Sequence, residues 1–104
     1  MEEGYKTIMM KPRDQVAVAL TDIPAGAQVQ VTCQSEVFMI ELRESIDFGH
    51  KFAVRSIRSG EDLYKYGEVF GIATRDIAPG EHVHVHNLEG KRGRGDLDEQ
   101  VGSR

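Results

Sequence analysis

Three of the four histidines in this chain stand at alternate positions in the segment His82-Val83-His84-Val85-His86. In an extended strand, side chains alternate between the two faces, so this spacing predicts three imidazoles on one face, about 6.5 Å apart along the strand. Two imidazoles placed in this way can converge on a metal ion or on a bound anion, because His-x-His is a spacing used by metal ligands. The same pattern fits an ordinary strand with a solvated polar face, and the residues alone leave both interpretations open.

Two predicted turns carry further candidates. His50 follows Gly49 at one of them, and an imidazole titrates close to physiological pH, so His50 could act as an acid, a base or a substrate contact. A turn histidine bonded to the backbone is the plainer interpretation. Lys65 and Tyr66 precede Gly67 at the other turn, where binding groups often lie. Lys65 could hold a substrate carboxylate and Tyr66 could donate a hydrogen bond to a sugar hydroxyl, but both could equally be surface residues.

The composition limits the classes of protein that fit. At 104 residues, the chain is long enough for one domain with a buried core. It has 13 basic and 17 acidic residues and a formal net charge of -4, which argues against a nucleic-acid-binding protein. No stretch is long and apolar enough for a membrane span, and the N-terminus lacks the apolar core of a signal peptide. The single cysteine, Cys33, can form no internal disulfide, so we expect a buried thiol and a cytoplasmic protein.

A pentapeptide that ends in glycine recurs along the chain and predicts its architecture. It reads Asp22-Ile23-Pro24-Ala25-Gly26, then Asp76-Ile77-Ala78-Pro79-Gly80, and more loosely Ser56-Ile57-Arg58-Ser59-Gly60. Proline presets φ and glycine accepts positive φ, so each copy predicts a turn, and its isoleucine should pack into a core. Short runs with strand character flank each copy, and no long segment has helical periodicity. The sequence therefore predicts an all-β domain over residues 1–88 and a mobile, Gly-rich charged tail over residues 89–104.

Together these motifs resemble the SAF domain of the altronate/galactarate dehydratase family, in its separately encoded small-subunit form. The chain is similar also to the small subunit of sulfolactate sulfo-lyase. The resemblance rests on the Asp-Ile-x-x-Gly turn and on the segments 49–53, 65–68 and 80–87 in the family's order, with the tail at 89–97. It implies a β-clip fold of short strands, a role in eliminating water from sugar acids, and a separate large subunit that holds most of the catalytic machinery. It also implies that His84 and His86 face the active site.

We therefore predict an accessory subunit that binds a sugar acid and supports its dehydration to a 2-keto-3-deoxy acid with a large catalytic subunit. Such a reaction needs a base for the proton beside the carboxylate, an acid for the leaving hydroxyl, and a cation that stabilises the enediolate. The predicted catalytic residues are His84, His86 and His50; the predicted substrate-binding residues are Asn87, Lys65, Tyr66, Arg92 and Arg94; and the predicted ligands of a divalent metal, Fe2+ or similar and shared with the large subunit, are His84 and His86. His82 directly follows a turn and is expected to be a solvated side chain.

Two other classes of protein fit the same residues. One is a non-catalytic β-clip module that binds a carbohydrate or a peptide, with its histidines facing solvent. The other is a small stand-alone metalloenzyme that uses His82, His84 and His86, although one small β-domain seldom encloses both a metal and a polyhydroxylated substrate. The exposed edges of short strands would also allow a homodimer. If the accessory-subunit interpretation holds, we expect His86→Ala to abolish turnover of the complex and to leave the fold intact.

Overall fold

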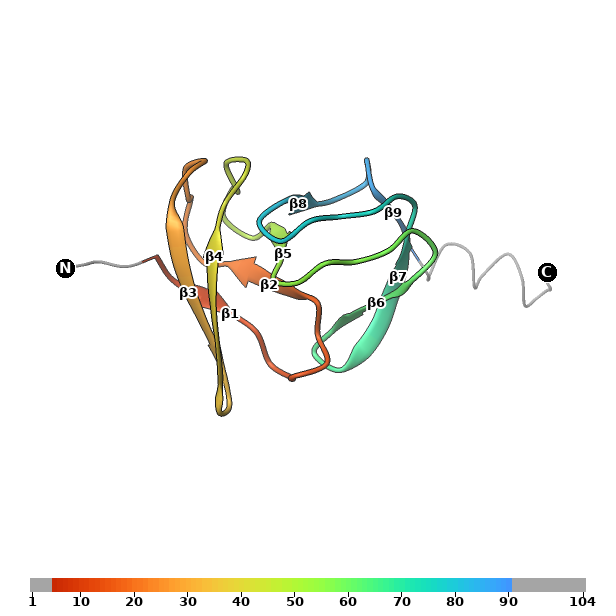
Figure 1. Ribbon diagram of the computed structural model, residues 1–104, viewed down its shortest axis with the longest axis horizontal. Coiled ribbons are helices and arrows are strands. Elements are labelled where there is room, and N and C mark those ends of the chain that lie inside the picture. The colour runs from red at the N-terminus through yellow and green to blue at the C-terminus, as the bar shows by residue number, and fades with distance from the viewer. Residues whose placement is uncertain (1–4, 91–104) are drawn as a thin grey trace.

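The computed structural model describes residues 5–90, whose regular elements are all short β-strands joined by tight turns (Figure 1). The strands are β1 (Thr7–Ile8), β2 (Val16–Ala19), β3 (Gln28–Cys33), β4 (Glu36–Glu41), β5 (Lys51–Ala53), β6 (Asp62–Lys65), β7 (Glu68–Ala73), β8 (His82–Val83) and β9 (Leu88–Gly90). The predicted all-β class is confirmed, since residues 5–90 form no helix. Accordingly, this part of the chain has no helix of the length and apolarity that a membrane crossing requires.

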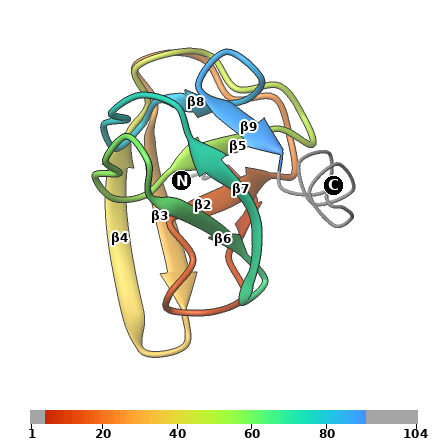
Figure 2. The ribbon, with the colours of Figure 1, turned by 90° about the vertical axis from the view of Figure 1, so that its right-hand side faces the viewer.

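The strands of residues 5–90 form three small antiparallel sheets. The central sheet has the order β1-β2-β5-β8, and it lies between the β3–β4 hairpin and the sheet of β6, β7 and β9 (Figure 1). Figure 2 views the molecule from the side of the β6–β7 hairpin, with β3 and β4 behind. Strands that are distant in the sequence become neighbours in the central sheet, because β5 pairs with β2 on one side and with β8 on the other. This pairing brings the residues just before β5 next to those at the end of β8.

The predicted turns are present, and the structure adds a fourth copy of the motif. Ser45-Ile46-Asp47-Phe48-Gly49 forms a turn of the same kind, which the sequence motif had not included. Ile23 bridges to Ile46 and Ile57 bridges to Ile77, and all four isoleucines are buried. The three isoleucines that we expected in the core are therefore there. The glycines that end the four turns, Gly26, Gly49, Gly60 and Gly80, have φ from 86° to 91°.

The aspartates of the motif join the turns in pairs. Asp22 Oδ1 accepts a hydrogen bond from the backbone N–H of Phe48 at 2.8 Å, and Asp76 Oδ1 accepts one from Ser59 at 2.8 Å. Each pair of turns closes one half of the described chain, and each half contains one long hairpin, β3–β4 or β6–β7. The repeat in the sequence therefore reflects two similar halves built in the same way.

Two apolar clusters fill the interior, one in each half. The first contains Phe52 and Cys33, and the second contains Leu63, Ile77 and Val83. Cys33 is only 2% exposed, so its predicted burial is confirmed. Phe52 lies on β5 and Val83 lies on β8, which means that this strand pair runs along the boundary between the two clusters.

The last described strand passes the domain boundary that we predicted at residue 88. β9 pairs with β7 and continues to Gly90, so residues 89 and 90 belong to the sheet. The rest of the predicted tail, with Arg92 and Arg94, lies outside the described residues 5–90.

Candidate functional site

The alternating histidine segment is not a single strand, so the prediction of one shared strand face is wrong beyond Val83. β8 ends at Val83, and a turn follows in which the backbone N–H of Asn87 donates to the carbonyl of His84 at 3.0 Å. The Asn87 side chain closes this turn, because its Oδ1 accepts from His84 N at 2.9 Å and its Nδ2 donates to the carbonyl of His82 at 2.8 Å. Asparagine often bonds nearby backbone in this way, so Asn87 is the signal in the sequence that could have indicated the turn.

Asn87 is 2% exposed, and both polar atoms of its amide are used within the turn. Its role in substrate binding stays a prediction. In this structure, the side chain holds the backbone on either side of Val83 and thereby positions the histidines around it.

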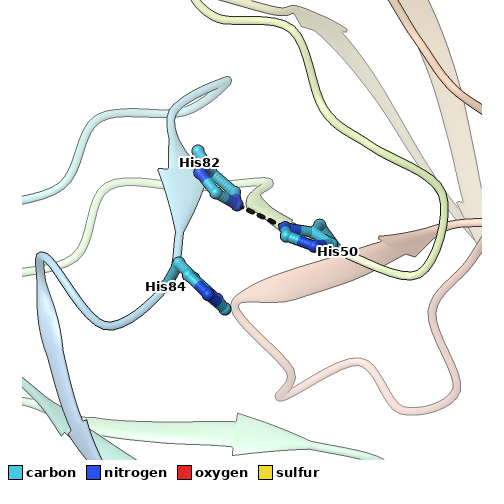
Figure 3. Close-up of side chains that lie close together, drawn as sticks. All are labelled: His50, His82 and His84. Carbon is cyan, nitrogen blue, oxygen red and sulfur yellow. Dashed lines mark hydrogen bonds between the residues drawn. The ribbon is translucent and has the colours of Figure 1, made fainter.

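Three imidazole rings meet where the residue before β5 approaches the end of β8 (Figure 3). The register of the two strands pairs Lys51 with Val83, which places His50 opposite His84. His50 Nδ1 lies 2.9 Å from His82 Nε2, a hydrogen-bond distance. The ring centroids are 5.0 Å apart for His50 and His82, 4.9 Å for His50 and His84, and 5.2 Å for His82 and His84. One ring nitrogen from each residue lies within 4.8 Å of the other two. We call these three residues the histidine cluster.

The histidine cluster differs from the predicted catalytic residues, because it includes His82 and does not include His86. His82, which we expected to be solvated, is half-buried and contacts the rings of His50 and His84. His86 lies outside the group of converging nitrogens; its ring is exposed and tilted by 38° against that of His82, at a centroid distance of 5.5 Å. The structure therefore brings His50, His82 and His84 together, and the role of His84 and His86 as metal ligands stays a prediction.

The surroundings of His82 and His84 favour their neutral imidazoles. Burial first, and then the positive charges of His50 and His84, lower the pKa of His82, while the carboxylate of Glu44 acts in the opposite direction. Loss of solvation, followed by the charge of His50, lowers the pKa of His84. Glu44 accepts a hydrogen bond from the backbone N–H of His82 at 3.0 Å rather than from its ring. The neutral form is the one that accepts a proton or binds a metal ion.

Two lysines lie against one aromatic ring, and the charge of one of them reaches the histidine cluster. The Nζ atoms of Lys51 and Lys65 lie 5.4 Å and 5.8 Å from the ring centroid of Phe70. Burial, and then the charge of Lys65, lowers the pKa of Lys51. Lys51 is also one of the charges that lower the pKa of His84, which means that its field reaches the cluster. A bound anion would relieve the repulsion between the two ammonium groups. Lys51 was not among the predicted site residues.

The predicted turn at Lys65 and Tyr66 is present and is held by a residue that we had not singled out. Tyr66 and Gly67 have φ of 58° and 83°, the positive values that a two-residue hairpin turn of type I′ requires. The carboxylate of Asp14, only 1% exposed, accepts hydrogen bonds from the backbone N–H of Tyr66 at 2.8 Å and of Gly67 at 2.9 Å. Tyr66 is 46% exposed, and Lys65 Nζ lies 5.3 Å from the centre of its ring.

The fold and the site define a class of protein: a small all-β domain of two similar halves, with a polyhistidine site on the strand pair that joins them. Residues 5–91 match the model of the altronate/galactarate dehydratase SAF domain, and the chain belongs to this family. The resemblance that the motifs indicated is therefore confirmed.

The relatives differ in how much of their own length the chain covers. The chain is 43% identical over 86 residues to altronate dehydratase of Escherichia coli (strain K12), an alignment that covers 83% of the chain and 16% of that protein. It is 40% identical over 82 residues to altronate dehydratase of Bacillus subtilis (strain 168), which covers 79% of the chain and 16% of that protein. It is 35% identical over 82 residues to (2R)-sulfolactate sulfo-lyase subunit alpha of Chromohalobacter salexigens, which covers 76% of the chain and 87% of that protein. The chain thus corresponds to a small part of the first two proteins and to most of the third.

Proposed function

We propose that this chain is the accessory subunit of a sugar-acid hydro-lyase, which works with a separate large catalytic subunit. The chain would help to bind an aldonate or aldarate and support its dehydration to a 2-keto-3-deoxy acid. The observation that carries the proposal is the pattern of similarity. The chain aligns with most of the length of a protein named as a lyase subunit. It is also more than a third identical to one segment of each of two much longer dehydratases.

The histidine cluster supplies groups that this elimination needs. His84 and His82 have lowered pKa values, so they are neutral near neutral pH and able to accept a proton. We assign the substrate-facing position to His84, because its side chain is exposed, while the half-buried His50 and His82 lie against it. His86 is the second candidate for this position, since it is exposed in the adjoining turn. A divalent cation held at these imidazoles would supply positive charge to the enediolate that forms as the proton leaves.

The lysine pair is the proposed site for the carboxylate of the substrate. Lys51 and Lys65 place two ammonium groups over Phe70, and an anion between them would offset their repulsion. Tyr66 lies at the adjoining turn, where its hydroxyl could donate to a sugar hydroxyl. Arg92 and Arg94 remain predicted contacts of the substrate.

A sulfonate substrate is the second candidate. It is favoured by coverage, because the chain spans 87% and 92% of two proteins named (2R)-sulfolactate sulfo-lyase subunit alpha. Elimination of sulfite from such a substrate would need the same base next to a carboxylate, but a different leaving group. The histidine cluster and the lysine pair are compatible with both reactions.

The experiment that tests the proposal is reconstitution with a candidate large subunit. Formation of 2-keto acid is measured on aldonates, aldarates and sulfolactate with divalent metal present, for each chain alone and for the mixture. We expect turnover only in the mixture, and turnover confined to sulfolactate would select the second candidate. Full activity of the large subunit alone would contradict an accessory role. Binding of a sugar acid to the isolated chain, without turnover in any mixture, would point to a binding module.

A further inference from the structure

We propose that His50, His82 and His84 form a metal site within this chain itself, which takes a first-row divalent transition-metal ion such as Zn2+ or Co2+. This inference deepens the proposed function, which would use a cation at the same imidazoles, but its test measures metal binding alone, so its failure can be told apart from failure of the lyase proposal. It also differs from the pair His84 and His86 that the sequence predicted.

The donor atoms are close to the separations that one ion requires. Nitrogens bound to Zn2+ at 2.0–2.1 Å in a tetrahedral site are about 3.3 Å apart. His50 Nδ1 and His82 Nε2 are 2.9 Å apart, and all three donors lie within 4.8 Å of one another. Binding therefore requires the His50–His82 contact to open by a few tenths of an ångström and the His84 ring to move inward. His84 is exposed, so its ring is free to make that movement.

The backbone already holds the ligands in place. His50 directly precedes β5, His82 begins β8, and the hydrogen-bonded register of these two strands fixes their separation. The backbone of the third ligand, His84, is held through its N–H, which donates to Asn87 Oδ1, and only its ring has to move. Little conformational entropy has to be lost when the ion binds, since two rings are half-buried and already stacked.

The chemistry of the set selects the class of metal. Imidazole nitrogen suits Zn2+, Co2+, Ni2+ and Cu2+, whereas Mg2+ and Ca2+ prefer oxygen ligands. The converging group consists of three histidines and includes no carboxylate. Without an ion, the hydrogen bond between His50 and His82 uses only one nitrogen of each ring. Three protein ligands leave a fourth position open, which is the arrangement of zinc sites that bind water or a substrate.

The test is a metal titration of the full-length chain, purified without a histidine tag and stripped with a chelator. Binding of Zn2+ is measured by calorimetry, and binding of Co2+ by its visible absorption. We expect a single ion per chain and no binding of Mg2+. His84→Gln and His82→Gln should each weaken Zn2+ binding at least about 100-fold, because even indirect partners of metal ligands are worth 10- to 100-fold. Val85→Gln is the matched control, because Val85 is 77% exposed in the same turn and offers no metal donor, and its affinity should equal that of the parent chain.

Several outcomes would overturn the site. They are no Zn2+ binding by the folded parent chain, unchanged affinity in His84→Gln, or a loss in Val85→Gln as large as that in His84→Gln. Circular dichroism of each metal-free variant verifies folding, and His84→Gln keeps the test decisive if His82→Gln fails to fold, because His84 is exposed. This experiment measures metal binding and not turnover. A negative result therefore would not contradict the lyase proposal, which the reconstitution assay tests.

Discussion

At the scale of single residues, His82 shows how a side chain acquires its surroundings from tertiary structure. Its ring contacts His50, although 32 residues separate the two in the sequence. Desolvation and neighbouring imidazoles both lower the pKa of His82 and favour its neutral form. From the sequence, a histidine directly after a turn was expected to be solvated.

Cys33 allows a test of burial at the same scale. Burial first, and then the charges of Asp14 and Glu36, raise the pKa of its thiol above the usual 9.0. The folded thiol therefore holds its proton to higher pH than the unfolded one, and the associated stability is lost as pH rises above the unfolded pKa. We expect iodoacetamide at pH 8 to modify Cys33 far more slowly in the native chain than in denaturant. Equal rates in the two states would contradict the buried position, and Cys33→Ser is the control for the assignment.

The residues of the site could be predicted from the sequence only in part. His50 and His84 were selected because imidazoles near turns can do acid–base and metal chemistry, and both belong to the histidine cluster. The sequence does not predict the place of His82 in the cluster, because the β5–β8 register that brings it to His50 depends on pairing between distant strands. Asp14 was missed for the same reason; its partners lie more than 50 residues away, at Tyr66 and Gly67.

At the scale of elements, the four Gly-ended turns fix where the functional segments begin. Gly80 ends the turn that leads into β8, and it packs against the backbone at the end of β4: a Cβ on Gly80 would collide with the carbonyl oxygen of Glu41, so no side chain fits there. Turns of this kind were predictable, because Gly and a buried Ile recur at fixed offsets, and two of the copies also contain Pro. The Ser45–Gly49 copy was not predicted, although the predicted Ser56–Gly60 copy lacks proline as well. β9 is too short to give a strand signal of its own.

Gly80 and Gly60 form a matched pair for testing this packing. Both have positive φ, 91° and 89°, but a Cβ at Gly60 would meet nothing within 4 Å, whereas one at Gly80 would collide with Glu41 O. Gly60→Ala should cost about 1–2 kcal/mol of unfolding free energy from its backbone conformation alone. Gly80→Ala adds a steric clash and should cost about 2–5 kcal/mol in total. Urea unfolding measures both, and equal losses in the two variants would show that Gly80 is not closely packed.

At the scale of the whole molecule, the candidate site lies on the surface of the strand pair that separates the two apolar clusters. His84 and His86 are exposed, so a substrate bound there by this chain alone would remain largely in water. Elimination reactions benefit from a site that excludes water and aligns charged groups. A second chain that covers the histidine cluster would provide this enclosure, which is consistent with the proposed accessory role. The all-β class could be predicted from local signals in the sequence. The position of the site between the two halves could not, because it depends on the pairing of β5 with β8.

The measurement that tests the central claim most directly is the kcat of the reconstituted complex with His84→Gln in place of the parent chain. A positioned acid–base group contributes about 100- to 10,000-fold to such a reaction, so we predict a fall in kcat of at least about 100-fold. Size-exclusion chromatography should show the same complex for both chains. A kcat equal to that of the parent complex, at equal assembly, would contradict the claim that this chain supplies its histidine cluster to the reaction.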